Sequence, residues 1–306
     1  MYDIIIIGSG PAGLTSAIYA TRSNLKTLVI EKGMIGGQAV LTNKIDNYPA
    51  LNDVSGFELM TNMFEHATNL GIEFLNKEVL KIDVTNKIKK VFVKDDVIET
   101  KTIILALGAK AKKLDVKGED EFLNKGVAYC AVCDGGLYKN KDVVVVGGGN
   151  TAVEDAIYLS SLASSVTMVN KKPEFTCNEH LKEEVNNLIK EGKVKVYFDS
   201  VIYEIKGENK VQELIVKCPE CNFPSIKCDA VFVAVGRNPD SEILKDTGVE
   251  LDSKGYVLSN EQMETNVQGV FVCGDVRQKE MRQIITACAD GAVASNSANK
   301  YIRKNF

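Results

Sequence analysis

The sequence lacks any apolar run approaching the roughly 18 residues that a membrane-spanning helix needs. Its first residues lead directly into a strand pattern, so we expect neither a signal peptide nor insertion into a membrane. A basic excess is also missing, because 37 Lys and Arg against 41 Asp and Glu give a net charge of −4. Proteins that neutralise nucleic-acid phosphates need the opposite balance, and we expect no nucleic-acid partner.

Low-complexity segments are absent too, and 45% hydrophobic with 25% charged residues is typical of a folded chain. The length of 306 residues is sufficient for two domains of ordinary size. Eight cysteines without a secretion signal indicate a reducing compartment, where thiols carry out chemistry or bind metal. We therefore expect a cytoplasmic protein.

The beginning of the chain has the pattern of a βαβ unit. A β-branched run at 3–7 ends in a Gly-x-Gly-x-x-Gly loop, a helical pattern runs from Leu14 to about Arg22, and the apolar run 27–30 ends at Glu31. Backbone N–H groups of such a loop can approach a pyrophosphate, and a carboxylate at the strand end can hydrogen-bond a ribose, although glycine turns also serve packing alone. The loop consists of Gly8, Ser9, Gly10, Pro11, Ala12 and Gly13.

The same pattern returns with the valine run 143–146, a second small-residue loop, a helix to about Leu162 and a strand at 166–169. Two such beginnings in one chain predict two nucleotide-binding domains with parallel sheets. The second loop consists of Gly147, Gly148, Gly149, Asn150, Thr151 and Ala152.

The strand after the second loop ends without an acid. It continues into Asn170, Lys171 and Lys172, and two ammonium groups would attract a 2′-phosphate that a carboxylate would repel. An ordinary solvated lysine pair is the alternative interpretation. The pattern favours a phosphorylated nucleotide in the second domain.

Two further apolar runs, at 103–107 and 231–235, each close a segment that one of the glycine loops begins. We expect the chain to cross between domains near Lys113 and Pro239, and a helix at about 283–301 to return to the first domain. The prediction is an α/β fold of two Rossmann-like dinucleotide-binding domains, the discontinuous first domain at 1–113 with 240–306 and the second at 114–239.

A Cys-x-x-Cys motif precedes the first strand of the second domain. Cys130 and Cys133 have the spacing of a small disulfide, and their proximity lowers the pKa of one thiol. Asp134 follows directly and can move a proton to or from a thiolate. Half of a zinc site is the alternative, but neither His66 nor His180 has a metal-ligand spacing, and we predict a redox disulfide and no metal.

The segment 218–228 holds three more cysteines between two β-like runs. Zinc would need a fourth ligand, for which Cys177 is the candidate, whereas free thiols or a secondary disulfide are the simpler alternatives. Cys273 and Cys288 are flanked by apolar or small residues and are predicted core thiols. The three cysteines of the segment are Cys218, Cys221 and Cys228.

Together these motifs resemble the low-molecular-weight bacterial thioredoxin reductases, over essentially the whole chain and in that family's order. The resemblance rests on both glycine loops, Gly36-Gly37-Gln38, the motif from Cys130 to Asp134, and Gly274-Asp275. It implies FAD in the first domain, NADPH in the second, a homodimer, and thioredoxin or a related small redoxin as partner. It also implies that the second domain rotates against the first during turnover.

The resemblance also implies roles for single residues. Cys133 would face the flavin, Cys130 would attack the partner's disulfide, and Asp134 would be the acid–base residue. Electrons would pass from NADPH to FAD, to the Cys130–Cys133 disulfide and then to the redoxin. The implied cofactor-binding residues besides the glycine loops are Glu31, Gly36, Gly37, Asp275 at the ribityl chain, Arg282, Lys171 and Lys172, with Gln38, Asn47, Gln283 and Ile284 around the isoalloxazine.

The chain departs from the family at its second strand end. The family has His-Arg-Arg followed by a further Arg, whereas this chain has Asn170-Lys171-Lys172 and then Thr176. Because lysine lacks the planar fork of arginine, we predict NADPH over NADH with a weakened preference. The alternatives are a reductase supplied by ferredoxin, a reductase of another redoxin, or a flavoprotein redox sensor without turnover.

Overall fold

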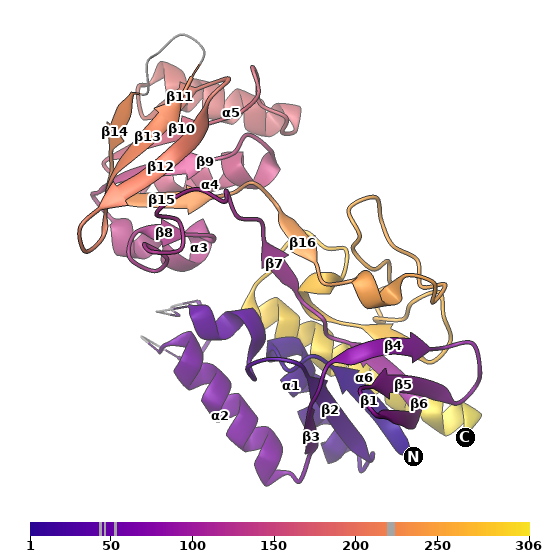
Figure 1. Cartoon of the computed structure of the whole chain (residues 1–306). Helices are drawn as coiled ribbons and strands as arrows, with labels where there is room; N and C mark the ends of the chain where they lie inside the picture. The colour runs from indigo at the N-terminus through magenta and orange to yellow at the C-terminus, as the bar shows by residue number, and fades with distance from the viewer. Residues whose placement is uncertain (43–44, 46, 52–53, 219–223) are drawn as a thin grey trace. The chain divides into compact units, whose positions relative to one another are not determined.

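The computed structural model describes residues 1–42, 45, 47–51, 54–218 and 224–306. Their packing divides the chain into two compact units, residues 1–110 with 238–306 and residues 111–237 (Figure 1). These divisions lie slightly before the crossings that we expected near Lys113 and Pro239.

In the first unit, seven of the described strands form one sheet in the order β3-β2-β1-β6-β5-β4, with β17 beside β6. Strands β1, β2, β3, β6 and β17 are parallel, whereas β4 and β5 are antiparallel neighbours. The strands are β1 (Tyr2–Ile7), β2 (Thr27–Glu31), β3 (Glu73–Asn76), β4 (Val79–Asp83), β5 (Lys89–Val93), β6 (Asp96–Leu105) and β17 (Val270–Val272).

The isoleucines of β1 explain the layers of this unit. Ile4 and Ile6 belong to a core cluster shared with the helices, whereas Ile5 and Ile7 belong to the cluster on the other face of the sheet. A strand buried on both faces is typical of the centre of a parallel sheet. The helices are α1 (Pro11–Arg22), α2 (Gly56–Asn69) and α6 (Ile284–Asn305), with the short turns η1 (Gly37–Leu41), η3 (Glu242–Leu244) and η4 (Gly274–Val276).

Helices α1 and α6 pack closely because small residues line their contact. A Cβ on Gly291 would collide with the backbone oxygen of Ala12, and the hydroxyl of Ser16 donates to the backbone oxygen of Gly291 over 3.0 Å. Helix α1 begins inside the glycine loop at Pro11, earlier than predicted, since proline is favoured in the first helical turn. Helix α6 extends to Asn305 because no glycine or proline interrupts its last turns.

In the second unit, five described strands form a parallel sheet in the order β11-β10-β9-β15-β8, and three form an antiparallel sheet, β12-β13-β14. Helix α4 follows the second glycine loop and buries Ala152, Val153, Ala156 and Leu159. The elements are β8 (Val127–Ala128), α3 (Ala131–Asp134), η2 (Gly135–Tyr138), β9 (Asp142–Val146), α4 (Asn150–Ser160), β10 (Ser165–Val169), α5 (Glu179–Lys190), β11 (Val194–Tyr197), β12 (Val201–Gly207), β13 (Val211–Lys217), β14 (Ser225–Lys227) and β15 (Ala230–Val233).

The two crossings of the chain pair with each other. Strand β7 (Ala109–Ala111) and strand β16 (Arg237–Pro239) form a two-stranded sheet at the places where the chain leaves one unit for the other (Figure 1). Among the helices of the described residues, none combines the length and apolarity that crossing a bilayer requires.

Candidate redox site and nucleotide-binding loops

The first glycine loop uses its glycines in two different ways. Gly8 has a φ of +104°, and a Cβ on it would collide with the backbone of Ala106; a Cβ on Gly13 would collide with Gly8. These two glycines are required by packing. Gly10 is different, because a Cβ there would meet only the backbone oxygen of Gly36, at 4.0 Å. Packing alone therefore does not account for Gly10, and its open side fits the close approach of a pyrophosphate.

Glu31 is held beside this loop by hydrogen bonds. Its Oε2 accepts from the backbone N–H of Ser9 over 2.9 Å and from the Ser9 hydroxyl over 2.8 Å, and its Oε1 accepts from the N–H of Gly33 over 2.9 Å. Ser9 is fully buried, so the carboxylate is fixed where β2 ends. This arrangement fits an acid that accepts the hydroxyls of a ribose.

Two further turns of the first unit reach the loop. The N–H of Gly36 donates to the backbone oxygen of Ser9 over 3.0 Å, and a Cβ on Gly37 would lie 3.3 Å from the Cα of Gly10. Gly274 begins η4 with a φ of +76°, and a Cβ there would lie 2.9 Å from the Cβ of Ala12. The predicted Gly-Gly and Gly-Asp motifs therefore converge on the start of α1.

The turn that carries Asp275 is supported by charged side chains. The carboxylate of buried Asp290 accepts from the N–H of Gly274 over 3.1 Å and from the ammonium of Lys279 over 2.8 Å. The guanidinium of Arg282 donates to the backbone oxygen of Asp275 over 3.4 Å. These contacts fix the position of Asp275, and nothing in the sequence pattern pointed to Asp290 or Lys279.

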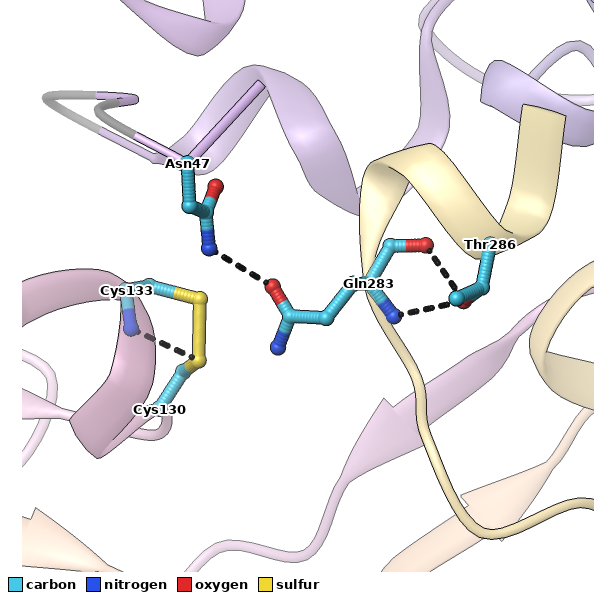
Figure 2. The surroundings of a disulfide bond; sticks show 5 residues. All are labelled: Asn47, Cys130, Cys133, Gln283 and Thr286. Atoms are coloured by element: carbon cyan, nitrogen blue, oxygen red, sulfur yellow. Dashed lines mark hydrogen bonds between the residues drawn. A yellow bond between two sulfur atoms is a disulfide. The ribbon is translucent and has the colours of Figure 1, made fainter. Parts of the chain in front are cut away.

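At the start of α6, Gln283 forms hydrogen bonds both within the helix and to Asn47, which is distant in the sequence. Gln283 and Thr286 form a capping box, in which the N–H of Gln283 donates to the Thr286 hydroxyl over 3.1 Å (Figure 2). The amide of Asn47 donates to Oε1 of Gln283 over 3.0 Å. The predicted residues Gln38 and Ile284 lie in η1 and at the first position of α6, and Gln38 is exposed.

The second glycine loop repeats the division found in the first. Gly147 has a φ of +140° and a Cβ on it would clash with Ala234, while a Cβ on Gly148 would collide with the side chain of Asn170. Gly149 has open space around its Cα. The open position again precedes a helix, so its N–H groups fit the phosphates of a second nucleotide.

The basic stretch after β10 folds back onto this loop. Asn170 is buried, and its side-chain amide donates to the backbone oxygen of Glu174 over 2.8 Å. The N–H of Thr176 donates to the backbone oxygen of Gly148 over 2.7 Å. Lys171 and Lys172 are exposed. The sequence reasoning missed the anchoring role of Asn170, which only the three-dimensional contact with Gly148 reveals.

The predicted disulfide between Cys130 and Cys133 is present at the start of α3. Their Cα atoms are 5.3 Å apart, both residues are half-buried, and the N–H of Cys133 donates to the sulfur of Cys130 over 3.2 Å (Figure 2). In the reduced state the same N–H would stabilise a thiolate on Cys130. The geometry therefore favours Cys130 as the more nucleophilic of the two sulfurs.

Asp134 is the last residue of α3, which we call the redox helix because it begins at the Cys130–Cys133 disulfide. Its backbone N–H donates to the oxygen of Cys130 over 3.1 Å, and burial raises the pKa of its carboxyl to about 6. A carboxyl that titrates just below neutral pH can both accept and return a proton under physiological conditions. Its chemistry fits the acid–base role predicted for it.

The remaining cysteines do not form a metal site among the described residues. Cys218 belongs to a disulfide, and Cys221 lies outside the described residues. Cys177 and Cys228 contact different core clusters on the two faces of the parallel sheet. The structure therefore gives no support to Cys177 as a fourth ligand, which was the zinc alternative.

Two other cysteines match their prediction. Cys273 and Cys288 are buried, as expected for core thiols, and burial raises the pKa of Cys273 to about 12. His66 and His180 are exposed on α2 and α5. Burial and a raised pKa make Cys273 and Cys288 poor nucleophiles at neutral pH.

Known proteins resemble this chain over almost its whole length. Residues 2–291 match the pyridine nucleotide-disulphide oxidoreductase family. The chain is 39% identical over 306 residues to the thioredoxin reductase of Bacillus subtilis strain 168, and the match covers 99% of this chain and 96% of that protein. The crystal structure of thioredoxin reductase from Streptococcus pyogenes MGAS5005 has 40% identity and a TM-score of 0.93, with 99% of each chain covered.

A third similarity concerns the electron donor. The crystal structure of a ferredoxin-flavin thioredoxin reductase from Clostridium acetobutylicum has 33% identity and a TM-score of 0.52, covering 98% of this chain and 97% of that one. Together the similar structures confirm the predicted α/β fold with two dinucleotide-binding domains.

Proposed function

This chain belongs to the pyridine nucleotide-disulphide oxidoreductase family, and we propose that it is a thioredoxin-disulfide reductase that works with FAD and NADPH. The family resemblance inferred from the motifs is confirmed by relatives that carry the name thioredoxin reductase. The single observation that carries the proposal is the Cys130–Cys133 disulfide, half-buried at the start of a helix in a unit with its own open glycine loop.

The first unit supplies the residues that would hold FAD. Gly10 leaves room for the pyrophosphate, Glu31 offers a fixed carboxylate to a ribose, and Asp275 lies on a turn braced against α1. Asn47 and Gln283 would complete the site at the start of α6. When bound, FAD would supply the two-electron chemistry that links a nicotinamide to a disulfide.

The dithiol form of the redox helix would reduce the partner by thiol–disulfide exchange. The Cys130 thiolate attacks one sulfur of the partner's disulfide and releases the other as a thiolate. The Cys133 thiolate then attacks the sulfur of Cys130, which restores the internal disulfide and releases the fully reduced partner. The carboxylate of Asp134 takes the proton from the attacking thiol and returns one to the leaving thiolate.

NADPH is the proposed donor, with a weakened preference over NADH. The exposed ammonium groups of Lys171 and Lys172 favour a 2′-phosphate, and the strand end offers no carboxylate to a free 2′-hydroxyl. Thr176, where the family has arginine, instead donates its N–H to the backbone of Gly148. The second candidate donor is reduced ferredoxin, favoured by the similarity to the ferredoxin-flavin enzyme.

Anaerobic mixing of the FAD-loaded protein with NADPH, NADH or reduced ferredoxin tests the donor. We expect NADPH to bleach the flavin absorbance at a lower concentration than NADH. Failure of both nucleotides at millimolar concentration, with bleaching by ferredoxin, would replace the nicotinamide step with the ferredoxin step. The predicted homodimer is tested separately by the mass of the protein in solution.

A further inference from the structure

A buried carboxylate joins two segments next to the redox disulfide. The side chain of Glu119 is only 2% exposed, and its oxygens accept from the N–H of Leu114 over 2.9 Å, from the N–H of Asp115 over 2.8 Å and from the hydroxyl of Tyr129 over 2.8 Å. A buried carboxylate is tolerated only where such donors compensate for the lost water. These three contacts therefore specify one arrangement of the segment between Leu114 and Tyr129.

The two ends of this segment have defined positions in the fold. Leu114 follows β7, at the place where the chain comes into the second unit, and Tyr129 directly precedes Cys130. Between them, Val127 of β8 pairs with Val231 of β15, the strand that leads toward the other crossing (Figure 1). The segment before the disulfide is thus connected to both crossings.

The middle of the segment rests on the antiparallel sheet. The N–H of Ile205 on β12 donates to the backbone oxygen of Lys117 over 2.9 Å. Gly118 has a φ of +88°, and a Cβ on it would collide with the backbone of Ile205. The ring of Tyr129 packs against the same core cluster as Ile205. Glu119 is therefore held against the antiparallel sheet, and its hydrogen bond to Tyr129 links it to the residue that directly precedes Cys130.

We propose that Glu119 and Tyr129 are positioning residues for the redox disulfide, and that their hydrogen bond restrains the backbone of Cys130. Burial and the neighbouring Glu119 raise the pKa of Tyr129 well above its usual value, so its hydroxyl stays a donor at physiological pH. Without this bond the start of α3 should open locally more often. The role in turnover rests on the proposed function, whereas the restraint itself does not.

Reduction of the disulfide by dithiothreitol measures the restraint without flavin transfer, nicotinamide or partner. The two thiols of dithiothreitol are oxidised to its cyclic disulfide while Cys130 and Cys133 become thiols. A maleimide traps these thiols, and mass analysis of the peptide that carries them separates them from the disulfide of Cys218 and from the free cysteines. Loss of one hydrogen bond to a charged acceptor corresponds to about a tenfold change in a local opening equilibrium. We therefore expect Tyr129→Phe to be reduced about tenfold faster than the wild type.

Two further variants separate positioning from folding. Tyr197→Phe removes a hydroxyl from β11 of the same unit that has no hydrogen bond to a described residue, and should react at the wild-type rate. Glu119→Gln keeps the shape of the side chain but places an amide donor where a carboxylate oxygen accepts, so it loses at least one of the three hydrogen bonds and should also speed the reduction. Because Tyr129→Phe and Glu119→Gln both disturb the hydrogen bonds of one carboxylate, their effects on the reduction rate should not simply multiply in the double variant.

Turnover gives the second measurement, using whichever nucleotide reduces the wild-type flavin. Tyr129→Phe should lower kcat for reduction of a thioredoxin disulfide and leave KM for the nucleotide unchanged. If no nucleotide reduces the wild-type flavin, the nicotinamide step of the proposed function fails, and dithiothreitol reduction alone decides the restraint. The proposal is overturned if Tyr129→Phe reacts with dithiothreitol at the wild-type rate below its melting temperature, or if the two substitutions multiply.

Discussion

The two glycine loops share a backbone design but differ in what surrounds them. Each has glycines that packing requires and one open glycine, Gly10 in the first loop and Gly149 in the second. A carboxylate, that of Glu31, is hydrogen-bonded to the first loop. At the corresponding strand end beside the second loop, the chain has exposed lysines instead. In the proposed function, the open glycine of each loop would provide room for phosphates, while the end of the next strand would determine which nucleotide binds and how firmly.

A leucine at the open glycine of each loop should have the largest effects and should distinguish FAD binding by the first loop from nicotinamide-nucleotide binding by the second. Gly10→Leu should yield protein without FAD and hence without activity, because the side chain occupies the space that the pyrophosphate needs. Gly149→Leu should keep FAD and raise KM for the nicotinamide nucleotide. Flavin absorbance per chain and steady-state kinetics measure the two effects. Full flavin content in Gly10→Leu would show that the first loop serves packing alone.

Asp134 belongs to neither loop, and its removal tests whether the redox helix works independently of them. Asp134→Asn should slow reduction of the partner by roughly 10²- to 10⁴-fold, as expected for a lost acid–base group, with FAD content and nucleotide KM unchanged. An equal loss with raised nucleotide KM would instead point to a disturbed second unit.

The pH dependence of the same step follows from the raised pKa of Asp134, about 6. The carboxylate form, which accepts the thiol proton, is present above this pKa and is lost as the pH falls through it. Wild-type turnover should therefore fall below about pH 6, and Asp134→Asn should lack this inflection.

The effect of Asp134 on the free energy of unfolding has the opposite sign to that of a salt-bridged acid. Because folding raises this pKa, ionisation of Asp134 disfavours the folded state, and its cost develops as the pH rises toward 6.

Removing the two lysines that follow β10 should have a smaller effect, and one that is selective for NADPH over NADH. Lys171→Ala with Lys172→Ala should raise KM for NADPH about tenfold, since exposed charge-assisted contacts are partly screened by solvent, and should change KM for NADH little. Lys193→Ala is the matched control, because this exposed lysine pairs with Glu191 just before β11 begins. Equal increases for both nucleotides would remove the 2′-phosphate from the explanation.

A basic residue at position 176 should increase the preference for NADPH over NADH, and this is the smallest of the expected effects. Its N–H bond to Gly148 comes from the backbone and survives substitution. Thr176→Arg should lower KM for NADPH severalfold, about what one screened charge-assisted bond provides, and leave KM for NADH unchanged. An unchanged ratio of the two KM values would show that this position does not face the nucleotide.

The central strands, the glycine turns and the redox disulfide could be predicted from the sequence because each depends on a local residue pattern. Isoleucine and valine runs buried on both faces identify the central strands, and Gly8 and Gly147 occur where a positive φ is required. The spacing of Cys130 and Cys133, with no further metal ligands at a suitable spacing, predicted their disulfide.

Other features depend on contacts that no local pattern records. The hydrogen bond from Asn47 to Gln283 joins two distant segments, and the burial of Asn170 against Gly148 follows from how β10 ends. In the sequence Glu119 is one charge in an acidic stretch, and only the structure places three donors around its carboxylate. Such residues are identified by burial and partners, which the sequence does not state.

The most direct test of the proposed activity is reduction of a thioredoxin disulfide with NADPH as the only source of electrons. New thiols on thioredoxin would be counted anaerobically with the wild type and with Cys133→Ser, both loaded with FAD. We expect continuous thiol production by the wild type and none by Cys133→Ser, although NADPH still bleaches the flavin of the variant. Thiol production by Cys133→Ser at the wild-type rate would contradict the role of the Cys130–Cys133 disulfide as the electron relay.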